Sequence, residues 1–251
     1  MIPLGPDTIL LVFLLFCRIG GCLMLMPGVS SARVPPQVRL FIALAVTLAL
    51  TPMLETALRP AVVNRPAANL LFLIASEVII GALIGILART FFLALQFMAT
   101  ATAMYIGFGA APGPGIEDHE PLPPLATLIT LTATVLLFLT DQHWEVLRAV
   151  LGSYAALPVT EPFSVDFSLA KLVGALSSAF TIALQISSPF LIYALIVNLM
   201  AGLANKLIPQ IPVFFIATPF VLAGGFFILY LTIGESLRLF MMGFMGWLAA
   251  G

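Results

Sequence analysis

The sequence predicts an all-helical, polytopic integral membrane protein. Three observations lead to this fold class: the 251-residue chain is 61% hydrophobic, only 8% of its residues are charged, and its mean hydropathy is +1.16. A soluble domain carries about 25% charged residues. With 10 basic and 11 acidic side chains, the chain lacks the charge to cover a water-facing surface of its size. Lipid or a large apolar protein surface must therefore surround it.

The apolar residues gather in six runs, at about 8–26, 40–54, 70–106, 122–140, 172–204 and 213–233. A helix needs roughly 20 residues to cross a bilayer, so each run is long enough to matter. Backbone groups in lipid must be hydrogen-bonded within the protein, and the run lengths fit helices rather than barrel strands. We expect one membrane-embedded domain over residues 1–251.

Three runs depart from straight single spans, so we expect broken and re-entrant helices. As one helix, the run at 70–106 would be about 55 Å long, nearly twice the ~30 Å hydrocarbon thickness. It must be a hairpin bent near Arg89 or a helix that leaves the bilayer. Pro189 removes one helical hydrogen bond, which neighbouring serines can replace, and Pro219 can bend the last run. We predict helix breaks at both prolines.

Three ionisable residues, Arg18, Glu77 and Arg89, lie inside apolar runs. Such residues cost several kcal/mol in lipid, so they are expected to face protein or water. Glu77 and Arg89 are about 18 Å apart along one straight helix and cannot pair within it. Glu77 could pair with Arg89 across a hairpin, or with Arg18. We favour a structural ion pair or a subunit contact over a role in transport.

Two glycines, Gly81 and Gly85, form a GxxxG pattern in the third run. In a membrane helix this pattern lets a second helix approach closely. The pattern therefore predicts a helix-packing face.

The segment YIGFGAAPGPG at 105–115 is the most informative local feature. Its glycines permit backbone conformations that other residues avoid, and its two prolines prevent a regular helix. Irregular apolar backbone beside a membrane helix is tolerated only inside protein or along a cavity. The segment is either a re-entrant, plugging loop or an ordinary exposed connection. Phe108 is the only aromatic residue between its first and last glycines, which makes it the favoured blocking side chain of a plug.

Catalytic and metal-binding patterns are poorly represented. The acidic stretch at 117–120 includes His119 but fits a solvated turn better than a metal site, because four adjacent residues rarely converge on one ion. We find no Ser/His/Asp spacing, nucleotide-binding loop or zinc signature. A net charge of −1 gives no electrostatic case for nucleic acid. We therefore expect no enzyme activity, no cofactor, no bound metal and no nucleic-acid partner.

Short motifs are spread over nearly the whole chain. They are FCRIGGCLMLMP (16–27), VP (34–35), VRL (38–40), TP (51–52), LTDQHW (139–144), SYAALP (153–158), Pro189, NLMAG (198–202), PQ (209–210) and VFF (213–215). Each motif is weak alone, but the series, in this order, resembles the FliR family of type III export-gate proteins.

The resemblance implies a function that composition does not show. FliR-like proteins belong to a helical, multi-subunit gate that forms the protein-conducting pore for flagellar subunits, which pass through it unfolded. Expected partners are FliP-like and FliQ-like membrane subunits and an FlhB-like subunit, and the expected place is the flagellar basal body in the bacterial inner membrane. By the same resemblance, residues up to about 160 are FliP-like helices with a plug loop, and about 165–251 form a FliQ-like helical hairpin. The implied plug comprises Tyr105, Ile106, Gly107, Phe108, Gly109, Ala110, Ala111, Pro112, Gly113, Pro114 and Gly115.

Two alternative functions remain at this point. Broken helices and intramembrane charges also suit a secondary transporter for a small solute, although the two halves of the chain show no matching breaks. The equivalent subunit of a virulence injectisome would share the same fold. A FliR-like export-gate subunit is the leading interpretation.

Overall fold

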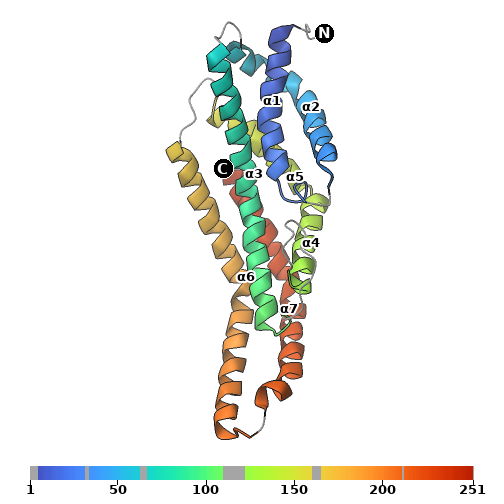
Figure 1. The fold of residues 1–251 in the computed structure, drawn as a ribbon, viewed down its shortest axis with the longest axis vertical. Helices are drawn as coiled ribbons and strands as arrows, with labels where there is room; N and C mark the ends of the chain where they lie inside the picture. Colours follow the sequence, from blue (N-terminus) through green and yellow to red (C-terminus); the bar gives the residue numbers. More distant parts are fainter. Residues whose placement is uncertain are drawn as a thin grey trace. The chain divides into compact units, whose positions relative to one another are not determined.

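A computed structural model describes residues 5–31, 34–62, 67–109, 122–159, 165–210 and 212–250. Over these ranges the chain folds into seven helices (Figure 1), which confirms the all-helical prediction. The helices are α1 (Pro6–Leu25), α2 (Pro36–Val62), α3 (Ala67–Tyr105), α4 (Pro124–Leu139), α5 (Gln142–Ala156), α6 (Val165–Leu207) and α7 (Val213–Ala250).

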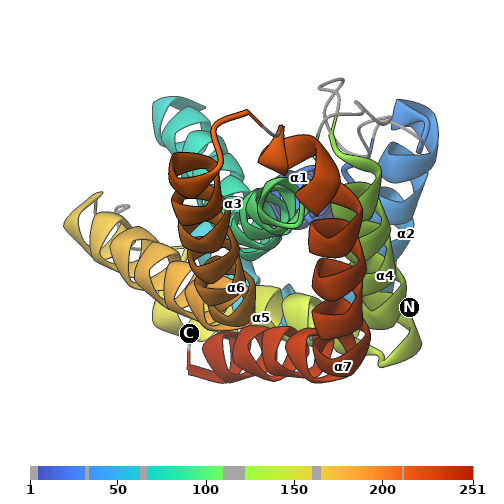
Figure 2. The same cartoon turned by 90° about the horizontal axis from the view of Figure 1, so that it is seen from below.

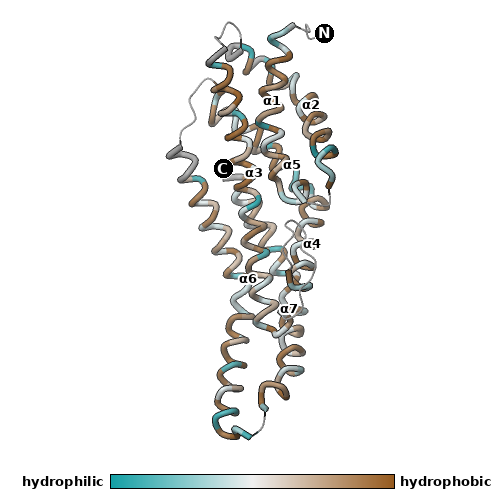
Figure 3. The backbone as a smooth tube through the Cα atoms, in the orientation of Figure 1, coloured by the Kyte–Doolittle hydropathy of each residue, from teal (hydrophilic) through white to brown (hydrophobic). Residues whose placement is uncertain are grey.

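The polytopic prediction is also confirmed. Within the described ranges, five helices are long and apolar enough to span a membrane, or six if α4 and α5 together form one bent span. Apolar residues dominate the length of most helices, as the brown segments of Figure 3 show. The one bent pair among these residues is α4 and α5, where Asp141 takes a left-handed conformation with φ 57°.

Helix α3 is continuous over 39 residues, from Ala67 to Tyr105. The predicted hairpin bent near Arg89 is therefore wrong, and the other alternative, a helix that leaves the bilayer, stays a prediction. At 1.5 Å per residue the helix is about 58 Å long, roughly twice the hydrocarbon thickness. No Pro or Gly lies near Arg89 to interrupt the helical hydrogen bonds, since Gly85 is a full turn away.

Two helical stretches lie outside the apolar runs. Helix α5 contains His143, Glu145 and Arg148. Because these residues are polar, the search for apolar runs did not detect this helix. Helix α7 continues past residue 233 to Ala250, through Glu235 and Arg238. Those two residues form an exposed ion pair of 3.9 Å one turn apart, so they are compatible with an uninterrupted helix.

Neither Pro189 nor Pro219 interrupts its helix, so the breaks predicted at these residues are wrong. At Pro189 the reason is visible. Proline has no N–H to donate to the carbonyl of Gln185, but the Ser188 hydroxyl donates to that carbonyl at 2.9 Å. The carbonyl is therefore satisfied, as the sequence predicted for a nearby serine, and α6 continues through the proline.

The chain divides into two compact units. The first contains Met1–Thr90, Asp141–Ala175 and Leu248–Gly251. In it, α1 packs against α2 and α5, and its buried side chains include Leu14, Leu15 and Ile19. The second unit contains Phe91–Thr140 and Leu176–Trp247.

The core of the second unit contains a cluster of aromatic rings. Phe92 of α3 meets Phe240 and Phe244 of α7 edge to face, with ring centroids 5.2 and 5.9 Å apart. Within this unit α6 and α7 run antiparallel as a hairpin (Figures 1 and 2). The Tyr193 hydroxyl of α6 donates to the Val221 carbonyl of α7 at 2.8 Å, which ties the two helices together.

Candidate functional site

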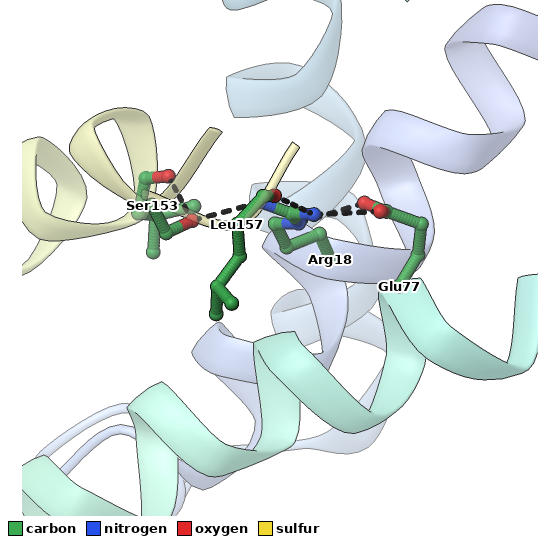
Figure 4. Close-up of polar contacts among 5 residues, drawn as sticks. Arg18, Glu77, Ser153 and Leu157 are labelled. Atoms are coloured by element: carbon green, nitrogen blue, oxygen red, sulfur yellow. Dashed lines mark hydrogen bonds and ion pairs between the residues drawn. The ribbon is translucent and has the colours of Figure 1, made fainter. Parts of the chain in front are cut away.

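The first candidate site is a buried ion pair between Arg18 of α1 and Glu77 of α3 (Figure 4). Arg18 Nε donates to Glu77 Oε2 at 2.7 Å, and Arg18 Nη2 donates to Glu77 Oε1 at 2.6 Å. The exposed fractions of the two side chains are 0% and 2%, so both charges are removed from solvent. Two parallel hydrogen bonds of this kind fix the relative orientation of the two side chains, while their opposite charges compensate each other.

The C-terminal end of α5 and the residue after it supply two further acceptors for Arg18. Arg18 Nη1 donates to the Ser153 hydroxyl at 3.0 Å, and Nη2 donates to the Leu157 carbonyl at 3.2 Å. The guanidinium carbon also lies 3.9 Å from the centre of the Tyr154 ring, a cation–π contact. One arginine therefore joins α1, α3 and α5. This arrangement fixes helices, and neither charged side chain is open to a solute within this unit.

Of the two partners that the sequence left open for Glu77, the structure selects Arg18. Arg89 lies twelve residues further along the same continuous helix and cannot reach Glu77 by a hairpin. Sequence reasoning missed the three residues at the C-terminal end of α5 and just beyond it, Ser153, Tyr154 and Leu157. The signal for them was indirect: a buried guanidinium has five N–H donors, so a single carboxylate could not satisfy it.

Close backbone packing between α1 and α3 brings the ion pair together. A Cβ at Gly81 would overlap the carbonyl oxygen of Arg18, and one at Gly85 would lie 2.6 Å from the Cys22 carbonyl oxygen. From the other side, a Cβ at Gly21 would lie 3.0 Å from the Val78 carbonyl oxygen. The GxxxG face is therefore covered by α1 of the same chain. Gly21 was missed because the glycines of α1 show no GxxxG spacing.

The second candidate site is the start of the predicted plug. Of its residues, Tyr105–Gly109 are described and 110–115 lie outside the described residues, as does the acidic stretch at 117–120. Helix α3 ends in a Schellman motif: Gly107 has φ 80°, its N–H donates to the Met104 carbonyl at 3.1 Å, and the Phe108 N–H donates to the Ala103 carbonyl at 2.8 Å. Glycine is favoured at Gly107 because the conformation is left-handed.

Phe108 does not project freely from this turn. Its ring meets the Phe226 ring of α7 edge to face, with centroids 5.4 Å apart. Both side chains remain partly exposed, at 36% for Phe108 and 40% for Phe226. In the described conformation the residue favoured for blocking is packed against α7.

Comparison with known proteins places these features in a family. The family model described as "Bacterial export proteins, family 1" matches residues 9–246, which is nearly the whole chain. The chain belongs to this family.

This chain is also similar to several named proteins. The flagellar biosynthetic protein FliR of Caulobacter vibrioides is 28% identical over 222 residues, covering 88% of this chain and 87% of that protein. FliR of Escherichia coli is 26% identical over 200 residues, covering 79% and 75%. Yop proteins translocation protein T of Yersinia pestis is 29% identical over 173 residues, covering 64% of each chain.

These similarities confirm the resemblance inferred from the motifs. The chain is a multi-pass membrane subunit of the type III export apparatus, and its similarity to FliR proteins supports service in flagellar biosynthesis. Residues 9–246 include both candidate sites.

Proposed function

We propose that this export protein is one subunit of a multi-subunit gate in the bacterial inner membrane, at the flagellar basal body, and lines a path for unfolded export substrates. The partners we propose are FliP-like, FliQ-like and FlhB-like membrane subunits. Support comes from membership of the export family and from the likeness to FliR proteins. No catalytic residue is assigned to the chain, and energy for export comes from its partners.

The observation that carries the proposal is the exposure of α6 and α7. Only 6% of the residues in the apolar stretch of α7 and 22% of those in the apolar stretch of α6 are buried, against 44% for α1. Exposed side chains on these helices include Phe215, Phe220 and Tyr230, at 83%, 74% and 80%. Apolar surface on this scale requires lipid or other subunits. We assign α6 and α7 the role of a FliQ-like hairpin, and the chain up to about residue 160 a FliP-like role.

Purification tests this proposal. The chain expressed alone should form unstable or aggregated particles in detergent, whereas co-expression with FliP-like and FliQ-like subunits should give one stable complex. A monodisperse monomer, stable in detergent and with full hydrogen-exchange protection along α6 and α7, would argue against it. Fractionation of the inner membrane then checks the location.

We further propose that residues 105–115 plug the closed pore. A closed pore must stop ions yet open for an unfolded chain, and apolar constrictions achieve this by excluding water. Deletion of residues 109–113 should leave the complex assembled but raise its passive conductance to small ions. The double substitution Asp118→Asn, Glu120→Gln keeps the loop length and serves as the control. If the deleted complex assembles and stays as tight as the wild type, the loop is not the plug.

A second candidate role is the equivalent subunit of an injectisome, which the likeness to Yop proteins translocation protein T favours. Complementation decides between the two. A strain that lacks its own FliR should regain motility with this chain if the flagellar role is correct. Restored effector secretion in an injectisome mutant, without restored motility, would favour the second role.

A further inference from the structure

The Gly224–Gly225 pair of α7 is contacted on two sides by different parts of the chain. On one side, a Cβ at Gly224 would lie 2.5 Å from the Tyr193 hydroxyl oxygen of α6. On the other side, a Cβ at Gly225 would lie 2.5 Å from both Cβ and Cγ2 of Ile106, the residue that follows α3. Both distances are below any that real Cβ atoms tolerate, so each neighbour occupies the space that a side chain on α7 would need.

Ile106 is held firmly in that space. It has no exposed surface, and its N–H donates to the Thr102 carbonyl at 3.1 Å. The next two residues also lie beside α7. The Phe108 ring meets the Phe226 ring, and a Cβ placed on Gly107 would lie 4.0 Å from a Leu222 methyl group. The turn that ends α3 therefore rests on one face of α7, over residues 222–226.

The obstruction at Gly225 is not one that a flexible side chain could relieve. The Cβ of Ile106 is fixed to the backbone, and its Cα lies 3.4 Å from the same point. Any residue larger than glycine at 225 must push the end of α3 away from α7. Gly234, on the same helix, provides the contrast, because a Cβ there would meet nothing within 4 Å.

We propose that Gly225 is a positioning residue, whose missing side chain seats Ile106 and so fixes where the plug loop leaves α3. The inference rests on the proposed function of that loop. Gly225 touches no export substrate in this account and acts through Ile106 and the Schellman turn. Tyr193 of α6 contacts the adjacent Gly224. A movement of the α6–α7 hairpin would therefore also shift Ile106, from which the loop begins.

The test uses the chain assembled with its partner subunits and compares Gly225→Ala with Gly234→Ala. Two quantities are measured: hydrogen exchange of the Phe108 amide, which is bonded to the Ala103 carbonyl, and passive ion conductance. The added methyl group should weaken the packing of Ile106 against α7, so Gly225→Ala should speed exchange on the order of tenfold and raise conductance. Gly234→Ala should change neither.

A second background separates seating from general damage. Ile106→Gly removes the obstructing Cβ and Cγ2, so adding Gly225→Ala to it should cause little further change in either measurement. Equal effects of Gly225→Ala in both backgrounds would overturn the inference. If Gly225→Ala prevents assembly, Phe226→Leu replaces it, because it weakens the contact with Phe108 and should give a smaller increase in exchange.

The outcomes distinguish this inference from the proposed plug. If hydrogen exchange of the Phe108 amide is unchanged in Gly225→Ala, Gly225 does not hold Ile106 in place, whatever the loop deletion does. Faster exchange without a leak, while deletion of 109–113 does leak, overturns the positioning role and leaves the plug intact. If Gly225→Ala speeds exchange but neither it nor the deletion of 109–113 raises conductance, Gly225 does hold Ile106 in place, and the loop is not the plug.

Discussion

Arg18 and Glu77 are 59 positions apart in the sequence and are joined by two hydrogen bonds, of 2.7 and 2.6 Å, across the α1–α3 interface. The pair is almost fully buried, and Ser153 of α5 and Leu157, which follows α5, supply two further acceptors for Arg18. A pair in this setting is costly to break from one side, because the partner charge stays behind without compensation. Its role is best tested by removing one partner and then both.

Arg18→Leu should destabilise the chain and impair its assembly with partner subunits. The expected loss is roughly 3–5 kcal/mol, since Glu77 would be left buried and uncompensated. The double variant Arg18→Leu, Glu77→Leu should recover much of that loss. Co-purification of partner subunits and thermal stability in detergent measure both.

Arg148→Leu is the matched control, because its 2.6 Å ion pair with Glu145 is as short but exposed. It should cost no more than about 1 kcal/mol. If Arg18→Leu assembles normally but secretes nothing, Arg18 belongs to the conduit and not to the framework.

Gly81→Ala should separate α1 from α3. Its new Cβ would overlap the Arg18 carbonyl, which belongs to the backbone and cannot rotate away. We expect a loss of at least about 1–3 kcal/mol, the usual cost of overpacking. Gly152→Ala on α5 should be neutral or stabilising, because nothing lies within 4 Å of its Cβ and alanine favours the helix. Thermal unfolding in detergent compares the two, and equal stability would mean that α1 and α3 are not held at this contact.

Ser188→Ala should weaken α6 at Pro189 by about 1 kcal/mol, because the Gln185 carbonyl would lose the donor that replaces the missing proline N–H. The double variant Ser188→Ala, Pro189→Ala should be at least as stable as the wild type, since the helical hydrogen bond can then form. Thermal stability of the purified complex provides the measurement. A single variant as stable as the double one would show that the hydroxyl contributes nothing.

Asp141 occupies a left-handed conformation, with φ 57°, between α4 and α5. Asp141→Gly should therefore preserve or raise stability, whereas the β-branched Asp141→Val should lower it by about 1–2 kcal/mol. Asp141→Asn serves as the control, since asparagine tolerates this conformation. The three are compared by thermal unfolding in detergent. Similar stability of the glycine and valine variants would contradict the argument from conformation.

The sequence alone determined the class of the protein. A charged content of 8% indicates a membrane protein, and apolar runs of this length favour helices over barrel strands, because lipid requires the backbone groups to be bonded within the protein. Its ordered motifs were enough to indicate the export family. Local chemistry also predicted that a serine would support α6 at Pro189, since the residues involved are neighbours in the chain.

Only the tertiary structure decided which distant residues meet. Hydropathy could not choose between Arg18 and Arg89 as the partner of Glu77, because the choice depended on whether α3 bends, and α3 is continuous. The acceptors on α5 and the seat of Ile106 on Gly225 are likewise contacts between helices. Such contacts depend on how each helix is rotated about its axis and how far apart the packed helices lie. The sequence pattern of a single apolar run determines neither quantity.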